Sequence, residues 1–216
     1  ITAAVLGYDD PGSGKAFVDL IVDSAGQKGT GRWSAIEAQM MGVPATAIEA
    51  AVAARAISSM RGERTAAAAV YPTLPVVPPS GGSDVLAELE LALLAGKIAA
   101  YAQGFAVLSA ASREFNWDLP LATVARIWRA GCIIRSQFLG AIAKAFEESG
   151  VSSNLMTTPA FVEMMTSAHP ALRVTVGRAA LQGLPVPALS AALAYFDSYR
   201  QARGTANLIQ AQRDYF

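Results

Sequence analysis

A chain of 216 residues can bury a substantial core in one domain or in two small ones. Its 17 lysines and arginines balance its 17 aspartates and glutamates, so the overall charge gives no electrostatic case for a nucleic-acid partner or an anionic membrane. Apolar residues make up 53% of the chain and charged residues only 16%, which indicates a large subunit interface or a neighbouring domain.

Single copies of histidine and cysteine bear on metal and disulfide chemistry. His169 has no second His or Cys nearby, so we expect no metal site, and Cys132 alone cannot form an internal disulfide. The apolar runs are judged too short to cross a membrane, and no signal peptide opens the chain. We therefore expect no membrane partner and a cytoplasmic location.

The predicted elements are helices, and no convincing pair of strands interrupts them. Only 17–24 is ambiguous, because its apolar spacing fits either a short helix or a strand. In chain order, the other helices are expected over 1–8, 34–41, 46–60, 83–115, from 120 through at least 135, 159–181, 188–203 and 206–215. This pattern predicts an all-α, multi-helix, bundle-like domain.

Start signals precede several of these helices. Thr46 and Glu49 have the spacing of a capping box, in which a hydroxyl and a carboxylate serve the first unpaired amides. Ser83 is expected to cap the longest helix. Asp118 is expected to cap the next one, with Pro120 in its first turn.

Two helices carry features that should shape the fold. The segment 127–135 is apolar on nearly all sides, so it is expected to be the central, buried helix. Arg126, Arg129 and Arg135 are expected to satisfy buried carbonyls or carboxylates there rather than to form an anion site. Pro170 is expected to kink or split the helix that contains it.

The passage 25–33, AGQKGTGRW, is the one stretch whose pattern is chemical rather than architectural. Three glycines free the backbone to turn N–H groups toward a ligand, and the helix that follows adds further donors and a positive dipole end. Lys28 adds a mobile charge and Thr30 a short hydroxyl, so the passage suits an oxyanion, most simply a phosphate. The alternative is a glycine-rich loop that merely joins two helices.

Arg55 lies three turns into the helix over 46–60, on an alanine-rich face. Two arrangements fit an arginine in this position. It extends to solvent, which is the usual arrangement, or it points into an anion site.

Two familiar phosphate motifs are excluded. The run 12–15, GSGK, ends like a P-loop, but Asp9 replaces its first glycine and Ala16 replaces its Ser/Thr. GTGRWS has Ser34 where the dinucleotide fingerprint has its last glycine, and no clear strand precedes it.

Three passages, in this order and spacing, resemble the C-terminal helical region of 6-phosphogluconate dehydrogenase: AGQKGTGRW (25–33), IWRAGCIIRSQFL (127–139) and AQRDYF (211–216). The resemblance covers essentially the whole chain. That family uses NADP to decarboxylate 6-phospho-D-gluconate oxidatively to ribulose 5-phosphate, in the pentose phosphate pathway. The resemblance therefore implies 6-phosphogluconate as substrate and NADP as cofactor, the latter bound mainly by an N-terminal Rossmann domain.

The resemblance also implies roles for particular residues. Lys28 and Thr30 match the loop that binds the substrate phosphate, and Arg55 matches the arginine that joins them from the next helix. Arg213 resembles the tail arginine that completes the phosphate site of the partner subunit.

The implied organisation is an all-helical substrate-binding and dimerisation domain over 1–203, followed by the start of a tail over 204–216. Both this organisation and the apolar excess lead us to expect a homodimer. The family's catalytic lysine and glutamate lie upstream of Ile1, so we expect no dehydrogenase activity from this chain alone. Two alternatives are a non-catalytic helical dimerisation or interaction module and a related β-hydroxyacid dehydrogenase that takes another phosphorylated acid.

Overall fold

The computed structural model describes residues 1–216 except 27, 79–81, 131–135, 137 and 150–153. In this part of the chain the regular elements are helices, and the only strand-like pairing is an antiparallel bridge between Asp9 and Ala16. The predicted all-α class is confirmed. The elements are α1 (Thr2–Leu6), α2 (Phe17–Leu20), α3 (Thr30–Met40), α4 (Thr46–Ser59), α5 (Arg61–Val70), α6 (Ser83–Glu114), α7 (Leu121–Trp128), α8 (Phe138–Ser149), the 3-10 turn η1 (Leu155–Thr157), α9 (Pro159–Leu181), α10 (Pro187–Tyr199) and α11 (Ala206–Tyr215).

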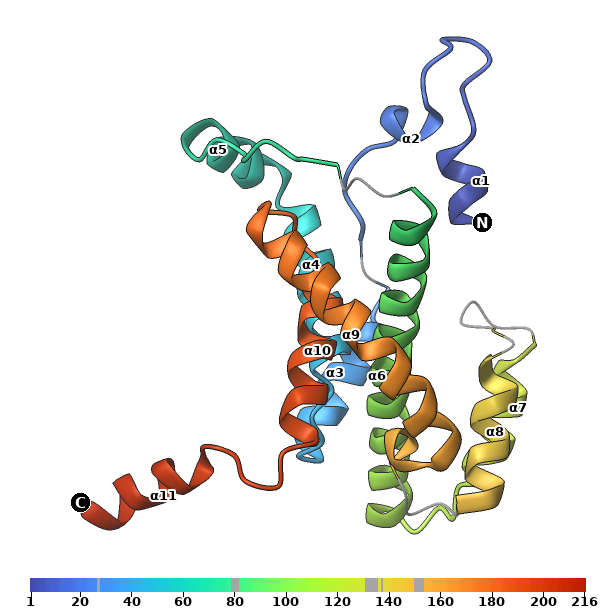
Figure 1. Cartoon of the computed structure of the whole chain (residues 1–216), viewed down its shortest axis with the longest axis vertical. Helices are drawn as coiled ribbons and strands as arrows, with labels where there is room; N and C mark the ends of the chain where they lie inside the picture. The colour runs from blue at the N-terminus through green and yellow to red at the C-terminus, as the bar shows by residue number, and fades with distance from the viewer. Residues whose placement is uncertain (27, 79–81, 131–135, 137, 150–153) are drawn as a thin grey trace.

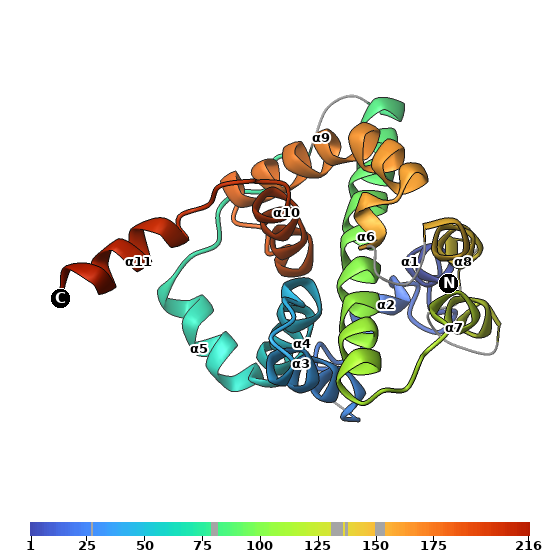
Figure 2. The same ribbon diagram turned by 90° about the horizontal axis from the view of Figure 1, so that it is seen from below.

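Helix α6 is the central element. It runs through the middle of the molecule, with α3, α4 and α10 on one side and the α7–α8 pair on the other, while α9 crosses it (Figures 1 and 2). Its buried residues recur at helical spacing: Ala92, Ala95, Gly96, Ile98, Ala99, Ala102, Gln103, Phe105, Ala111 and Ser112. Small residues at these positions let neighbouring helices approach closely, and a Cβ added at Gly96 would lie 2.4 Å from Leu189 Cδ2 of α10.

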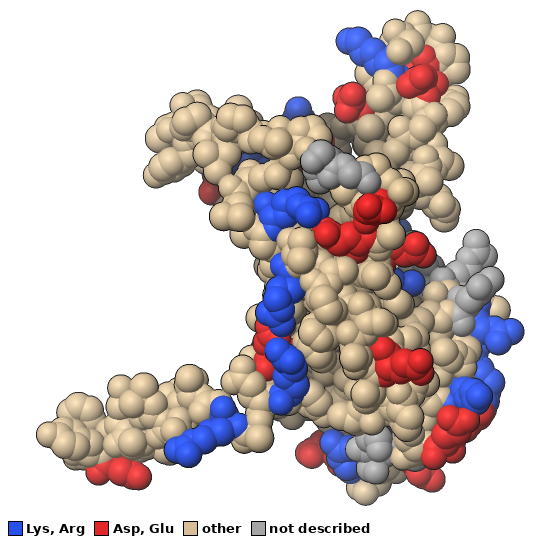
Figure 3. Space-filling model, viewed as in Figure 1, with Lys and Arg blue, Asp and Glu red and all other residues tan. Residues whose placement is uncertain are grey.

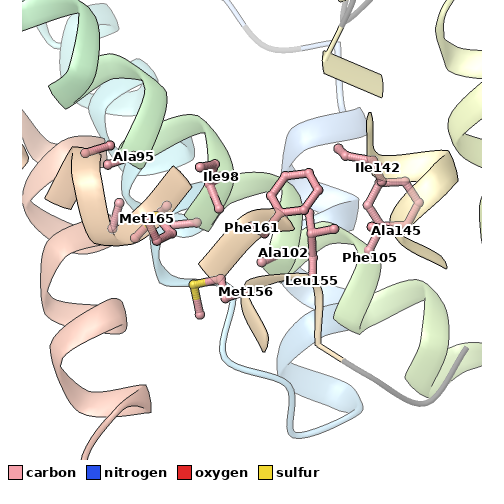
Figure 4. Close-up of a cluster of buried hydrophobic side chains, with 14 of the residues drawn as sticks. Ala95, Ile98, Ala102, Phe105, Ile142, Ala145, Leu155, Met156, Phe161 and Met165 are labelled. Atoms are coloured by element: carbon pink, nitrogen blue, oxygen red, sulfur yellow. The ribbon is translucent and has the colours of Figure 1, made fainter. Parts of the chain in front are cut away.

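Aliphatic and aromatic side chains together fill the core between α6, α8 and α9 (Figure 4). Phe105 packs against Phe146 with 5.0 Å between ring centroids, and Phe161 meets Phe138 edge to face at 5.2 Å. Offset and edge-on contacts of this kind are the favoured geometries of aromatic pairs. The core therefore joins helices that lie far apart in the sequence.

The prediction of a central, buried helix over 127–135 is wrong for the part that the structure describes, 127–130. Helix α7 ends at Trp128, and the Ile127 side chain is 65% exposed. The side chains of Arg126 and Glu147 form an ion pair, and both are about half exposed, so the arginine meets a carboxylate but not a buried one. Arg129 is exposed, and Cys132 and Arg135 lie outside the described residues.

The predicted capping box at the start of α4 is also wrong. Ala45 is the N-cap residue, and no side chain caps the helix end from within. Thr46 Oγ1 instead accepts a hydrogen bond from Gln103 Nε2 at 3.2 Å and donates one to the Ala191 carbonyl at 3.4 Å. Glu49 accepts from Gln39 Nε2 at 2.7 Å. Partners that packing brings from other helices have replaced the local ones.

The other two predicted helix caps, Ser83 and Asp118, are wrong as well. Gly82 and Pro120 occupy the N-cap positions of α6 and α7, and neither helix has a side-chain cap. The Ser83 hydroxyl lies 3.5 Å from the carboxylate of its neighbour Asp84. Asp118 adopts a left-handed backbone with φ 49°, in the turn between the two helices.

Several helix boundaries differ from the prediction. Helix α3 begins at Thr30 rather than residue 34, and α10 ends at Tyr199 rather than residue 203. The ambiguous 17–24 contains the short helix α2, and α9 continues through Pro170 without a split. Helices α5 and α8 were not predicted, whereas α11 matches its predicted range.

Helix α6 also corrects the expectation about membrane-spanning runs. It is long and apolar enough to cross a membrane by length and composition. However, 44% of its most apolar 18-residue window is buried inside the protein, where it forms the core with the other helices. The core helix of a water-soluble protein meets the same criterion, so the helix alone does not establish a membrane partner.

Candidate anion site

The glycine loop that precedes α3 is fastened to the second half of α4. The Ala25 N–H donates to Ser58 Oγ at 3.0 Å, and Arg55 Nη2 donates to the carbonyl oxygen of Gly26. Ser58 lies one turn after Arg55, so both contacts come from the same face of α4. The structure therefore brings the Arg55 guanidinium to the loop that the sequence identified.

At two positions of the loop, the structure itself requires glycine. Gly29 is the N-cap residue of α3 with φ +112°, and an added Cβ would lie 3.2 Å from two ring carbons of Trp33. Gly31 lies in the first turn of α3, where an added Cβ would lie 3.3 Å from Val52 Cγ2 of α4. The glycine pattern is thus partly architectural, since it allows the turn into α3 and the close approach of α3 to α4.

Lys28 and Thr30 lie at the start of α3, and both are exposed. The Trp33 N–H makes the first helical hydrogen bond, to the Gly29 carbonyl at 2.8 Å. The N–H groups of the three residues before it therefore precede the hydrogen-bonded ladder of the helix. Together with the helix dipole, these groups favour an anion at this end.

Three of the basic residues around the loop are not neutralised from within the described part of the chain. Lys28, Arg32 and Arg55 have no carboxylate within ion-pair distance there, whereas Arg64, Arg173 and Arg178 each pair with one. Arg55 uses one of its five N–H donors on Gly26 and keeps others for a ligand. The local charge is therefore positive, although the chain as a whole is neutral.

Two further residues, which the sequence did not single out, hold the loop. Ser58 accepts from Ala25 and donates to the Arg55 carbonyl at 2.8 Å. Arg64, from α5, donates to the Asp23 carbonyl at 3.2 Å and to the Asp23 carboxylate at 2.5 Å, and this hydrogen bond lowers the pKa of the Asp23 carboxyl. The Ala25–Ser58 and Asp23–Arg64 pairs are separated by 33 and 41 residues, so no local sequence pattern predicts them.

Arg213 does not join the other predicted site residues within one chain. It lies on α11, all of whose residues are exposed, and α11 extends away from the body in both views (Figures 1 and 2). The resemblance assigned Arg213 to the partner's site, which a single chain does not test.

The donor set fits a phosphate ester better than a dinucleotide or a metal ion. Among the described residues there is no group of three His, Cys, Asp or Glu side chains arranged for a metal. The dinucleotide-binding arrangement needs a parallel sheet before its glycine-rich turn, and the described segment before α3 is the short helix α2. Lysine, threonine and arginine beside a helix start are groups that bind phosphate oxygens.

Comparisons with known proteins find similar sequences along the whole chain. A family model described as 6-phosphogluconate dehydrogenase, C-terminal domain, matches residues 1–216. The NADP(+)-dependent, decarboxylating 6-phosphogluconate dehydrogenase of Bacillus subtilis is 46% identical over 217 residues, which cover 100% of this chain and 46% of that protein. The Saccharomyces cerevisiae protein named 6-phosphogluconate dehydrogenase, decarboxylating 1, is 45% identical over 219 residues, which cover 100% of this chain and 44% of that protein.

A solved structure shows the same fold. It belongs to a study of Plasmodium falciparum 6-phosphogluconate dehydrogenase in its apo form and in complexes with its cofactor NADP+ and its substrate 6-phosphogluconate. The TM-score is 0.94 at 39% sequence identity, and the match covers 100% of this chain and 46% of the other. The chain thus spans about half the length of the relatives that it matches.

Proposed function

Because this chain belongs to the family of 6-phosphogluconate dehydrogenase C-terminal domains, we propose that it is the substrate-binding and dimerisation domain of an NADP-dependent, decarboxylating 6-phosphogluconate dehydrogenase. Residues 1–203 form the domain proper, and 204–216 begin a tail that reaches the partner subunit. The substrate is 6-phosphogluconate, and the enzyme works in the cytoplasm.

One observation supports this proposal above the others. The guanidinium of Arg55 lies against the glycine loop, where it donates to Gly26, next to Lys28 and Thr30 at the start of α3. A loop that only connected two helices would not need a lysine, a threonine and an arginine of a third segment at the same place. These groups bind the phosphate of the substrate.

The phosphate lies at the end of the substrate remote from the reacting carbon, so this domain contributes by positioning. Clamping a remote group fixes the orientation of the reacting centre and lets binding energy support the chemical step. Each charge-assisted contact contributes roughly 1.5–3 kcal/mol, about ten- to a hundredfold in affinity. The phosphate clamp therefore affects substrate affinity strongly.

The chemistry itself requires groups that this chain does not supply. Oxidation of a β-hydroxy acid at C3 gives a β-keto acid, which loses carbon dioxide to leave an enediol that must be protonated. NADP supplies the hydride acceptor when bound, and the resemblance places its main binding site and the acid–base pair upstream of Ile1. The residues of this chain hold the substrate phosphate, and Arg213 completes the site of the partner subunit.

Dimerisation has support in the exposed apolar surface. Several large apolar side chains of α11 and the chain end are more than half exposed: Leu208, Ile209, Tyr215 and Phe216. On the face shown in Figure 3, basic groups form a row over α9 and α10, whereas most of α11 is uncharged. A projecting helix with several exposed apolar side chains is stabilised when another subunit covers those side chains.

Calorimetric titration of the chain with 6-phosphogluconate and with inorganic phosphate tests the phosphate site. Lys28→Ala and Arg55→Ala should each weaken binding about tenfold or more, because each removes a charge-assisted contact. Lys15→Ala is the matched control, since Lys15 is also an exposed lysine beside a glycine. It should leave the affinity unchanged.

Four results would contradict the proposal or part of it. If the folded wild-type chain binds neither compound, the chain is a non-catalytic helical module. If it binds another phosphorylated acid in preference to 6-phosphogluconate, it comes from a related β-hydroxyacid dehydrogenase. Sedimentation of a monomer at micromolar concentration would overturn the homodimer, and turnover of 6-phosphogluconate and NADP by this chain alone would refute the upstream placement of the acid–base pair.

A further inference from the structure

The approach to the glycine loop is held at three points by side chains of α4 and α5. Arg64 holds Asp23 by two contacts, to its carbonyl and to its carboxylate. Ser58 holds the N–H of Ala25, and Arg55 holds the carbonyl of Gly26. The anchored residues thus lie two, three and five positions before Lys28 in the chain.

The other side of the loop is fixed by packing. Gly29 turns the chain into α3 with its Cα close to the Trp33 ring, and Gly31 places α3 against Val52 of α4. Lys28 therefore lies in a short span between two anchored points. The contacts that fix these two points therefore determine where the Lys28 backbone lies relative to Arg55.

Two of the anchoring side chains, those of Arg64 and Ser58, also make hydrogen bonds to the backbone of α4. Arg64 Nη1 donates to the Ser58 carbonyl at 3.1 Å, as well as to Asp23. Ser58 Oγ in turn donates to the Arg55 carbonyl. A continuous set of hydrogen bonds thus runs from Asp23 through Arg64 and Ser58 to the backbone of Arg55. Because α5 begins two residues after α4 ends, this set also fixes how α5 turns away from α4.

We propose that Asp23, Ser58 and Arg64 are positioning residues of the phosphate site: they hold the glycine loop on α4 so that Lys28, Thr30 and Arg55 meet one phosphate. This inference rests on the proposed function. Their contacts in the structure are with the loop and with the backbone of α4. They determine affinity by keeping the ligand-binding groups in place before the ligand arrives.

The test compares variants in the same calorimetric titration with inorganic phosphate and with 6-phosphogluconate. Asp23→Asn and Ser58→Ala should each weaken binding about three- to tenfold, the range that one ordinary hydrogen bond accounts for. Ser58→Thr keeps the hydroxyl and should restore most of the affinity. In the full-length enzyme, the same variants should raise KM and also lower kcat, because contacts with the remote phosphate both bind the substrate and orient its reacting carbon.

A matched control separates positioning from general stability. Glu147→Gln removes the carboxylate of the ion pair between Arg126 and Glu147. The side chains of this pair are 50% and 52% exposed, compared with 38% and 78% for Arg64 and Asp23. It should leave phosphate affinity unchanged. Thermal melting of every variant reports whether the fold is retained.

The outcomes distinguish this inference from the proposed function. If Lys28→Ala abolishes binding but Asp23→Asn and Ser58→Ala bind like the wild type, the phosphate site stands and the positioning role is refuted. If Glu147→Gln weakens binding as much as Asp23→Asn does, the effect is general and the positioning role is again refuted. If the wild type binds no phosphate compound, both proposals are overturned.

Discussion

The side-chain oxygen of Gln103, on α6, accepts a hydrogen bond at 2.9 Å from the N–H of Ala47 in the first turn of α4. Gln103 is fully buried, and its amide nitrogen donates to Thr46 Oγ1, which donates on to α10. One glutamine thus satisfies an N–H at a helix start and joins three helices. Since α4 carries Arg55 and Ser58, this contact also supports the candidate site from behind.

Replacing Gln103 should destabilise the domain. Gln103→Leu preserves most of the volume but leaves the Ala47 N–H and the Thr46 hydroxyl without that partner, which costs about 1–3 kcal/mol. Urea denaturation measures the free energy of unfolding. Gln201→Ala, at an exposed position after α10, should change it by less than about 0.5 kcal/mol. Equal effects of the two substitutions would contradict a specific role for the buried amide.

Gly96 should tolerate a side chain poorly because of α10. Gly96→Ala places a methyl group 2.4 Å from Leu189 Cδ2, so Leu189 has to move, and overpacking of this kind costs about 1–3 kcal/mol. Adding Leu189→Ala should relieve the clash, which would appear as non-additivity in a double-mutant cycle.

Gly62 is the control for Gly96. It lies in α5 with no atom within 4 Å of an added Cβ, so Gly62→Ala should stabilise the protein by about 0.4–1 kcal/mol. Thermal melting of both variants decides the matter. A destabilised Gly62→Ala would show that α5 is packed more tightly than the structure indicates.

Gly29 should be the least replaceable glycine of the loop. Gly29→Ala forces a side chain into the left-handed region at φ +112° and against the Trp33 ring, which costs at least about 1–2 kcal/mol. The same change displaces Lys28, so phosphate affinity should fall as well. Gly26→Ala, with open space around its Cβ, should retain both stability and affinity. If both variants bind phosphate equally, the turn at Gly29 does not set the site.

His169 should make stability fall as the pH decreases. Its ring lies 5.1 Å from that of Phe196, its Nδ1 is buried without a hydrogen-bond partner in the described residues, and burial lowers its pKa. The charges of Arg200 and Arg173 lower that pKa further, while Asp197 opposes them.

The sign follows from proton binding. In the unfolded state the histidine has a pKa near 6.5, so at pH values just below 6.5 the unfolded state binds more protons than the folded state. The free energy of unfolding therefore decreases as the pH falls through this range. His169→Gln cannot titrate and should flatten this part of the profile. Denaturation at pH values from 7.5 to 5 measures it. Parallel profiles for wild type and variant would refute the role of His169.

The sequence by itself determined the helical class, most helix positions and the glycine loop. Apolar spacing and prolines act over three or four residues, so their information is local. The range of α11, the helix over 159–181 and the break after Met41 all follow from such signals. Residues Lys28 and Thr30 were recognisable because the glycines, the cation and the hydroxyl lie side by side in the chain.

Tertiary structure decided which side chains serve which backbone groups. Thr46 could have capped its own helix, but packing against α6 and α10 gave its hydroxyl other partners. The apolar 127–135 was expected at the centre, yet α6 lies there, because alanines and a glycine let more helices approach it. Ser58 and Arg64 joined the loop through contacts spanning more than 30 residues. Such contacts form only when distant helices pack together, so their residues carry no mark in the local sequence.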